Sequence, residues 1–285
     1  MNKKTIRLVT ITGSRTNTLR HMLQHYNALV DEIFVVVYEW EGFSTYESVL
    51  EIVNEFPKAK IIKKVTKEKY NWEYVTELYN EIKNLYPKDW WIVSDDDEFH
   101  IYSNNLDEII SDCEEFGWDM VRGGFIDRIG IDGEFVEIQK NKNIFKQFPM
   151  GGFFRYPMSG ACPNKVCIMK GYIQLTPGQH YAIINGQTTW RWQGWNHPLI
   201  APVDRYNVQV HHFKWDSTCS DRIRDVASIN KDYAYSEEYR KMYKELAKSR
   251  FVIDINNEDY MFENIGDSIS GYSKWNKLLN KILSI

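Results

Sequence analysis

Residues 89–99 read DWWIVSDDDEF, an apolar run that stops at three aspartates and a glutamate. The part WWIVS (90–94) has the composition of a short buried strand. Four adjacent carboxylates at the end of such a strand repel one another unless something positive lies among them. Residues 95–98 are therefore the first candidate functional site.

The residues before this stretch alternate between two patterns, apolar runs that predict strands and apolar residues at helical spacing. Strands are expected at 6–12, 32–38, 59–65 and 90–94, and helices at 19–30, 45–56 and 75–86. This alternation predicts parallel strands joined by right-handed crossovers, an α/β fold with a doubly wound, mostly parallel sheet. Ligands of such sheets bind beyond the carboxyl ends of the strands, where residues 95–98 are expected.

The remaining sequence is less regular. It predicts a helix over 106–116, a strand over 119–129 with an Asp-Gly turn in GIDGEF (130–135), and a strand over 209–215. Residues 145–200 are rich in glycine, proline and aromatic residues and predict irregular structure, and a helical tail is expected over 220–250 and 271–285. No repeat, low-complexity linker or convincing domain boundary interrupts the chain, so one domain over 1–285 is expected.

The composition excludes some classes of protein. The net charge is −4, and because no Lys/Arg stripe stands out we expect no nucleic acid as a partner. The four cysteines form no CxxC pair and are expected to be reduced thiols. No stretch resembles a signal peptide or approaches the roughly 18 apolar residues of a membrane span, so a soluble, cytoplasmic protein without a transmembrane segment is expected.

Three interpretations of the acidic cluster remain open from the residues alone. It is a solvated loop, an acid/base pair acting on substrate, or a site for Mg²⁺ or Mn²⁺. The strand-end position and the lack of a nearby basic residue in the sequence favour the cation. Asp95 and Asp97 would point to the same side of an extended segment, one toward the ion and the other toward ribose hydroxyls or a metal-bound water.

Several stretches together resemble a known group. They are DDD (95–97) followed by EF, GGFIDRIGIDGEF (123–135), QFPMGG (147–152), PNKVCIMKG (163–171), LTPGQHYA (175–182) and VHHFKWD (210–216). On these the chain from about residue 5 to 220 resembles the GT-A glycosyltransferases, in particular family 2-like and family 92-like enzymes. The resemblance divides the domain into a nucleotide-sugar-binding half (1–100), a metal-completing and acceptor half (101–220) and a helical tail (221–285).

The resemblance implies a nucleotide-sugar donor, UDP-linked in the first instance, and a Mn²⁺ or Mg²⁺ ion between the acidic motif and the diphosphate. Asp97 would bind the ion directly, Asp95 would bind the ribose or a metal-bound water, and Asp96 would belong to the donor site. A histidine of the C-terminal half often completes the metal shell in such enzymes. His211 and His212 alternate in direction, so only one can serve, and His212 is chosen.

Further donor contacts are expected from the first loop, TITGSRTNTL (10–19), which leaves a strand and enters a helix. Exposed N–H groups at such a place favour a phosphate, so Thr12 and Arg15 are assigned to the donor, although a plain capped turn explains the loop equally well. By resemblance, Glu39 would accept a hydrogen bond from a uracil N–H. Its alternative is a surface carboxylate.

Two basic residues would neutralise the diphosphate leaving group as it gains charge. These are Arg128, which would bind it bidentately, and Lys165, which would act as a point charge. A surface salt bridge is the alternative for either.

The acceptor side is expected in QTTWRWQGWNHP (187–198), where Trp190, Trp192 and Trp195 have no regular period. Exposed rings stack on sugar faces, although an aromatic packing loop is the alternative. The acceptor would be a glycan, a lipid-linked molecule or a protein.

An inverting transferase also needs a general base, for which Asp127 is chosen. Asp216, Glu134 and Asp204 are alternatives. The acidic pair that often carries the base in family 2 has no obvious counterpart here, so the base and the stereochemistry stay open.

The C-terminal segment GYSKWNKLLNKILSI (271–285) places Trp275 and four aliphatic residues on one face and lysines toward the other. Such a helix either rests weakly on an anionic membrane or docks on the domain or on a twin subunit. The function expected from the whole sequence is a metal-dependent hexosyltransferase of glycan or polysaccharide synthesis. The rivals are a nucleotidyltransferase, whose Gly/Lys-rich first loop is lacking, and a carbohydrate-binding protein without turnover.

Overall fold

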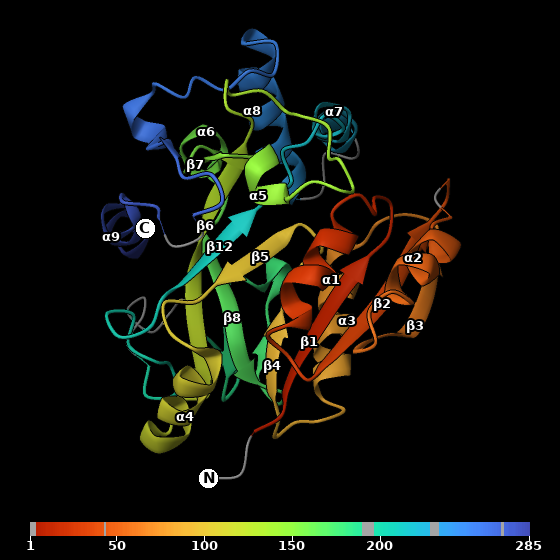
Figure 1. Ribbon diagram of the computed structural model, residues 1–285, viewed down its shortest axis with the longest axis vertical. Coiled ribbons are helices and arrows are strands. Elements are labelled where there is room, and N and C mark those ends of the chain that lie inside the picture. The colour runs from red at the N-terminus through yellow and green to blue at the C-terminus, as the bar shows by residue number, and fades with distance from the viewer. Residues whose placement is uncertain (1–3, 43, 190–196, 229–233, 269–270) are drawn as a thin grey trace. The chain divides into compact units, whose positions relative to one another are not determined.

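The computed structural model describes residues 4–42, 44–189, 197–228, 234–268 and 271–285. These residues form two compact units whose segments alternate along the chain (Figure 1). The first unit comprises Met1–Gly124 and Asn164–Val210, and the second comprises Phe125–Pro163 and His211–Ile285. The predicted single domain thus contains two units, and the chain passes between them within β6 (Met120–Ile129) and β12 (Val208–His212).

The first unit is built on four parallel strands in the order β4-β1-β2-β3. They are β1 (Ile6–Thr12), β2 (Glu32–Trp40), β3 (Ala59–Lys67) and β4 (Trp90–Val93). Val9 of β1, for example, pairs with Phe34 of β2 and with Val93 of β4. β1, β2 and β4 are almost wholly buried, which explains their continuous apolar runs. The predicted doubly wound α/β fold is confirmed.

Helices cover both faces of these strands. Figure 1 shows α1 and α2 in front of the sheet and α3 behind it. The helices of this unit are α1 (Leu19–Asn27), α2 (Tyr46–Val53), α3 (Trp72–Lys83) and α4 (Leu106–Phe116). α3 starts where the Asn71 side chain accepts a 2.8 Å hydrogen bond from Tyr74 N. The predicted helices are confirmed, with ends that differ by a few residues.

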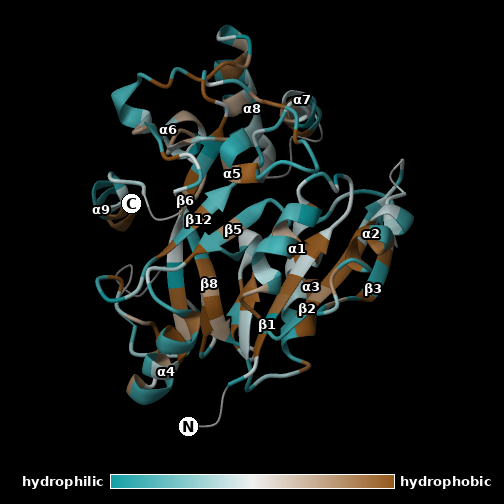
Figure 2. Ribbon diagram, viewed as in Figure 1, coloured by the Kyte–Doolittle hydropathy of each residue, from teal (hydrophilic) through white to brown (hydrophobic). Residues whose placement is uncertain are grey.

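The core of the first unit lies where strand and helix side chains meet. Val36, Leu78 and Trp91 are fully buried there, and Figure 2 shows hydrophobic residues along the central strands and hydrophilic ones on the outer turns of the helices. Burying each large apolar side chain contributes about 1.5–3 kcal/mol, so this interface fixes the directions of the strands.

Part of the segment predicted to be irregular forms strands instead. β8 (Asn164–Lys170) lies antiparallel to β4 on its free side, and the first half of β6 pairs with β8. A small separate antiparallel sheet contains β9 (Gln174–Leu175), β10 (Ala182–Ile184) and β11 (Gln187–Thr188). β5 (Glu98–Ile101) directly follows the aspartates and was not predicted. β5, β9, β10 and β11 have two to four residues each, too few to show a periodicity, whereas β8 has seven.

The second unit combines a short sheet with helices. The second half of β6 pairs with β7 (Met150–Gly152), and β7 pairs with β13 (Glu263–Asn264). Its helices are α5 (Ile144–Gln147), α6 (Arg155–Ser159), α7 (Cys219–Ser228), α8 (Ala234–Lys248) and α9 (Trp275–Leu283). The predicted turn in GIDGEF forms, with Gly133 at φ 81°, where an added Cβ would lie 2.0 Å from Ile253 O. The helical tail is confirmed.

The apolar face of α9 is buried. Trp275, Leu278, Leu279 and Ile282 are each at most 8% exposed, and Lys277 is exposed. This agrees with the alternative in which the helix docks on the protein and not with the weak membrane contact, because the same side chains cannot contact protein and lipid together.

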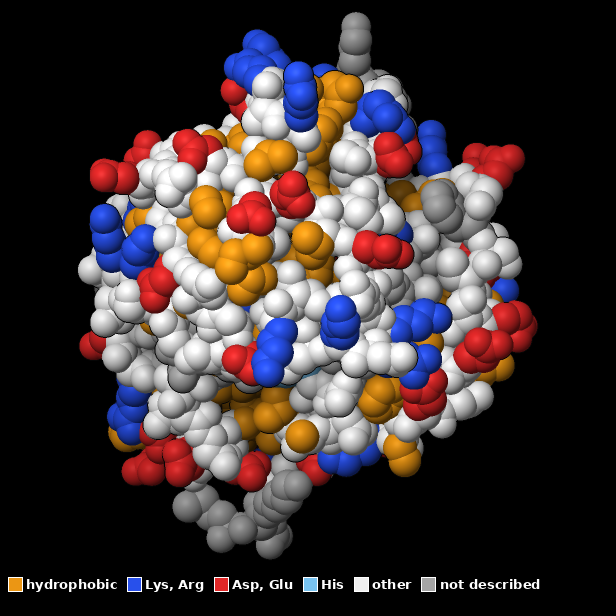
Figure 3. All heavy atoms as spheres, turned by 45° about the horizontal axis from the view of Figure 1, so that its top comes forward, with side chains coloured by type: hydrophobic (Ala, Val, Ile, Leu, Met, Phe, Trp, Pro, Cys, Tyr) orange, Lys and Arg blue, Asp and Glu red, His pale blue; other side chains and the backbone are white. Residues whose placement is uncertain are grey.

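The surface drawn in Figure 3 mixes acidic and basic side chains, with apolar side chains between them. Among the described residues, no helix has the length and apolar character that crossing a bilayer requires.

Candidate active site

The order β3-β2-β1-β4 creates a topological switch point between β1 and β4. The chain moves outward from β1 through β2 to β3 and then returns to the other side of β1 as β4. In open α/β sheets ligands bind at the carboxyl ends of the strands beside such a point. β1 ends there at Thr12, and β4 is followed there by Ser94 and the three aspartates.

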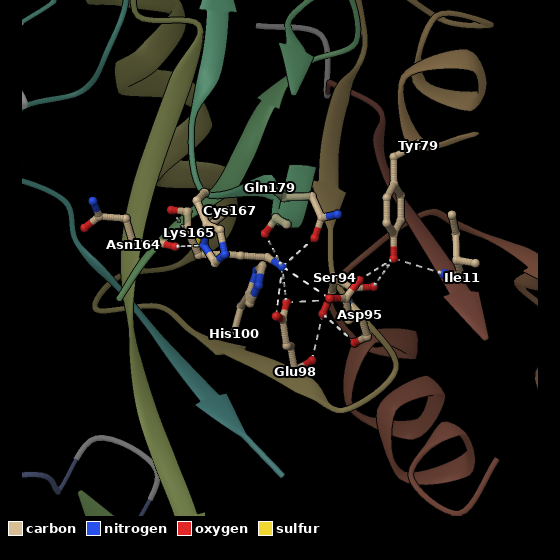
Figure 4. A network of polar contacts seen from close by, with 12 residues as sticks. Ile11, Tyr79, Ser94, Asp95, Glu98, His100, Asn164, Lys165, Cys167 and Gln179 are labelled. Carbon is tan, nitrogen blue, oxygen red and sulfur yellow. Dashed lines mark hydrogen bonds and ion pairs between the residues drawn. The ribbon is translucent and has the colours of Figure 1, made fainter. Parts of the chain in front are cut away.

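Asp95 is the first carboxylate after β4, and its side chain is 40% exposed. Its Oδ1 accepts a 2.7 Å hydrogen bond from the Tyr79 hydroxyl of α3 (Figure 4). The same hydroxyl accepts a 3.2 Å hydrogen bond from Ile11 N of β1. Asp95 is therefore connected through Tyr79 to the neighbouring strand and still faces solvent.

Asp96 connects the ends of the two strands at the switch point. Its Oδ2 accepts a 2.6 Å hydrogen bond from the Thr12 hydroxyl. Burial and the charge of Asp97 raise the pKa of Asp96 to about 7, against the opposing effects of the Thr12 hydrogen bond and the Arg15 charge. The predicted donor residues Thr12, Arg15 and Asp96 thus interact with one another.

Glu98 turns away from solvent and meets a lysine. Lys165 Nζ of β8 lies 2.8 Å from Glu98 Oε1 and 2.7 Å from Oε2 (Figure 4). Burial disfavours the charged ammonium, but the carboxylates of Asp95 and Glu98 outweigh it and raise the pKa of Lys165. The positive charge that the acidic stretch requires is therefore partly supplied by the protein. Because its ammonium group already contacts Glu98, Lys165 is less suited to the direct contact with the diphosphate that the sequence predicted.

Few side chains are arranged to bind a divalent cation. Among the described residues no group of three or more His, Cys, Asp or Glu side chains is arranged to hold a metal ion. Asp95 and Asp97 offer hard carboxylate oxygens, which fit Mg²⁺ or Mn²⁺ where a diphosphate supplies further oxygens. His212, the predicted third ligand, belongs to the second unit.

Asp127 and His212 are neighbours within the second unit. His212 Nδ1 lies 3.7 Å from Asp127 Oδ1, which also accepts a 3.0 Å hydrogen bond from Trp215 Nε1. Asp127 Oδ2 accepts a 3.0 Å hydrogen bond from Arg155 N. Burial raises the pKa of Asp127, an environment that suits a general base better than that of an exposed aspartate.

The other candidate bases have different surroundings. Asp216 Oδ1 accepts hydrogen bonds from Thr218 N and from the Thr218 hydroxyl, at 2.9 and 2.6 Å, just before α7. Glu134 and Asp204 are exposed.

Arg128 lies in the interior of the second unit. Its guanidinium donates hydrogen bonds to the carbonyl oxygens of Phe145, Phe148 and Gly266, and it lies 2.9 Å from His211 Nδ1. The residue is fully buried, and burial lowers its pKa to about 9. This position favours a role in holding the second unit together over the predicted contact with a diphosphate, because these nitrogens are already engaged.

Glu39 caps a helix. Its Oε1 accepts hydrogen bonds from Thr45 N and Tyr46 N at the start of α2, both at 2.8 Å, and its Oε2 lies 3.0 Å from Lys64 Nζ. Thr45 makes no cap hydrogen bond with its own side chain, so Glu39 supplies the acceptor instead. This favours a structural role over the predicted contact with a nucleobase.

The predicted acceptor residues Trp190, Trp192 and Trp195 lie outside the described residues. Two members of the site were missed. Tyr79 was assigned to the buried face of its helix, and Gln179 lies in the segment predicted to be irregular. The helical spacing of Tyr79 gave no sign that its hydroxyl reaches Asp95. Gln179 lies in the turn Pro177–Gln179 after β9, and its contact with Lys165 depends on how that turn folds back onto β8.

No protein-family model and no curated protein sequence matches the chain. Among solved structures it is similar to residues 1–349 of S. aureus TarS in complex with UDP, with 12% identity over 89% of this chain and 73% of that one and a TM-score of 0.38. It is also similar to a longer S. aureus TarS structure, with 10% identity over 89% of this chain and 44% of that one and a TM-score of 0.35. A third similar structure is mannose-6-phosphate isomerase from Helicobacter pylori, with 16% identity over 46% of this chain and 54% of that one and a TM-score of 0.30. The chain thus spans about half the length of the last two. Because these identities and TM-scores are low, its function is argued from its own residues.

Proposed function

We propose that the chain is a GT-A-type glycosyltransferase that moves a sugar from a nucleotide-sugar donor, UDP-linked in the first instance, to an acceptor hydroxyl. The observation that carries this proposal is the position of Asp95, Asp96 and Asp97 at the switch point between β1 and β4, joined to β1 through Thr12. Two neighbouring carboxylates at this edge, Asp95 with a 40% exposed side chain and Asp97 largely buried, offer the hard oxygens that a cation bound to a diphosphate needs.

The residues of the first unit would bind the donor. Asp97 would hold Mn²⁺ or Mg²⁺, Asp95 would bind the ribose or a metal-bound water, and Arg15 would approach the diphosphate. When bound, the cation would offset the charge of the departing nucleoside diphosphate. His212 remains the proposed further ligand.

The acceptor would be activated by Asp127 of the second unit and bound by tryptophans of the first. Asp127 would take the proton of the attacking hydroxyl, which displaces the nucleoside diphosphate directly and inverts the sugar carbon. The buried environment of Asp127 supports this choice, since a raised pKa brings a carboxylate closer to the working range of a base. The three tryptophans of the 187–198 segment would stack on the acceptor.

A thermal-shift screen of nucleoside diphosphates and nucleotide sugars, each with and without Mn²⁺, tests the proposal. A true donor raises the melting temperature by an amount that grows with the logarithm of its affinity at a fixed ligand concentration, and only with the cation. Asp97→Asn should abolish this shift, whereas Asp204→Asn, a change at an exposed aspartate of the same unit, should leave it unchanged.

Two results would contradict the proposal. If a nucleoside triphosphate stabilises the chain, and the chain releases pyrophosphate in the presence of a sugar phosphate, it is a nucleotidyltransferase. A binding protein without turnover would keep its affinity for sugars in the Asp97→Asn variant and release no nucleoside diphosphate.

A further inference from the structure

Lys165 reaches the acidic cluster through the pairing of two strands far apart in the sequence. β8 runs antiparallel to β4, with Trp90 opposite Lys170 and Ile92 opposite Ile168. Continued for three residues, this register places Lys165 opposite Asp95. The Lys165 side chain is fully buried, so it approaches the cluster from inside the protein.

The ammonium group of Lys165 has several partners in this interior. Besides both oxygens of Glu98, Nζ lies 2.6 Å from Gln179 Oε1, 3.4 Å from Gly178 O and 3.6 Å from Asp95 Oδ2 (Figure 4). Gln179 is buried and adopts a left-handed backbone conformation (φ 54°), which costs a residue with a side chain about 1 kcal/mol. The turn is held in this conformation while its amide oxygen contacts the ammonium group.

Asp95 is consequently held from two sides. Tyr79 donates to one carboxylate oxygen, the Lys165 charge faces the other, and the backbone N of Asp95 donates to Glu98 Oε2 at 3.3 Å. Glu98 and Lys165 are both buried, whereas Asp95 remains 40% exposed. The network thus fixes the one member that a ligand can reach.

We propose that Lys165 is a positioning residue, which holds the Asp95 carboxylate in the orientation that binds the donor ribose or a metal-bound water; this rests on the proposed glycosyltransferase function. A ligand could not replace Asp95 or Glu98 at the ammonium group without opening the interior. Lys165 therefore acts on the donor through Asp95.

Lys165→Met has two effects that must be separated: it removes the positive charge that faces Asp95, and it leaves Glu98 buried without its cation. The second effect destabilises a protein strongly. Combining Lys165→Met with Glu98→Gln removes both charges and recovers much of that stability, since a neutral amide is cheaper to bury. The double variant still lacks the positive charge that faces Asp95. It therefore separates positioning from folding.

The experiment compares wild type, Lys165→Met, Lys165→Met/Glu98→Gln and Lys170→Met. Lys170 is a matched control, because it lies on the same strand and pairs with a different glutamate, Glu114. The readouts are the melting temperature without ligand, the affinity for Mn²⁺ with UDP, and a crystal structure of the double variant. In the double variant we expect most of the stability to return, the affinity to remain about ten- to hundredfold below wild type, and the Asp95–Tyr79 contact to be lost.

The outcomes separate this proposal from the function on which it rests. Wild-type affinity in a stable double variant, or an unmoved Asp95 in its crystal structure, overturns the positioning role. If wild type binds neither Mn²⁺ with UDP nor any donor of the screen, the proposed function fails. The position of Asp95 in the crystal structure then still decides whether Lys165 orients it.

Discussion

The hydroxyl group of Thr12, the last residue of β1, donates a 2.6 Å hydrogen bond to Oδ2 of Asp96, two residues beyond Ser94 at the end of β4. It ties the two strands together at the edge where ligands of such sheets bind. Thr12→Val removes the donor while keeping the shape of the side chain. We expect a loss of about 1–3 kcal/mol in the free energy of unfolding, because a bond to a charged acceptor is lost. Urea denaturation measures it.

The control for this change is Thr66→Val, at an exposed position of β3. This variant should unfold within about 0.5 kcal/mol of wild type. An equal, small effect at both positions would show that the Thr12–Asp96 contact contributes nothing to stability.

The pKa of Asp96 predicts how stability depends on pH. Burial first, and then the charge of Asp97, raise this pKa from 3.8 to about 7, so the folded chain binds the Asp96 proton more tightly than the unfolded chain. The contribution of Asp96 is therefore fully present at low pH and declines as pH rises from about 4 through 7. Asp96→Asn should flatten that decline, whose upper limit is about 4 kcal/mol, since the shift is about three pKa units and one unit corresponds to about 1.4 kcal/mol.

Urea denaturation of the ligand-free protein between pH 5 and 8 measures this slope. Asp204→Asn should follow the wild-type curve. A steeper decline in Asp96→Asn than in wild type would have the wrong sign for a carboxyl group with a raised pKa. Mn²⁺ with UDP should reduce the wild-type decline, because bound positive charge favours the ionised carboxylate.

A substitution at Glu39 tests whether this residue caps α2 or contacts the ligand. Glu39→Ala removes the acceptor for two backbone N–H groups at the start of α2, and we expect a loss of about 1–2 kcal/mol in stability. The nucleotide-induced thermal shift should be unchanged. Lys64→Met, which removes only the half-exposed ion pair, should cost less than about 1 kcal/mol. A shift that disappears in Glu39→Ala alone would instead support the sequence-based contact with uracil.

The proposed role of Asp127 as general base is tested by Asp127→Asn, which replaces a carboxylate whose two oxygens both accept hydrogen bonds. Asp127→Asn turns an NH₂ group toward Trp215 Nε1 or toward Arg155 N, so the second unit should lose about 1–3 kcal/mol in stability. If Asp127 is the base, release of UDP from the donor falls at least hundredfold while Mn²⁺-dependent UDP affinity is retained.

Asp216→Asn is the matched control, since an asparagine oxygen can still accept from Thr218. It should keep both stability and turnover. Loss of turnover in Asp216→Asn together with wild-type turnover in Asp127→Asn would transfer the role of base to Asp216.

The candidate site could be predicted only in part. The aspartates 95–97 and Thr12 could be located because strand-end positions follow from local periodicity, and the structure brings Asp96 and Thr12 together. The surroundings of Glu39 and Arg128 could not be predicted, because a charged side chain in a sequence looks the same whether it faces a ligand, a helix end or a set of carbonyl oxygens.

The sequence by itself determined the alternation of strands and helices in the first hundred residues and the acidic end of β4, because both depend on side chains within one element. Only the tertiary structure decided that β8 inserts beside β4 and delivers Lys165 to Asp95 and Glu98. That pairing joins residues about seventy positions apart, and the register of two strands is set by the packing of the whole sheet rather than by the sequence of either strand.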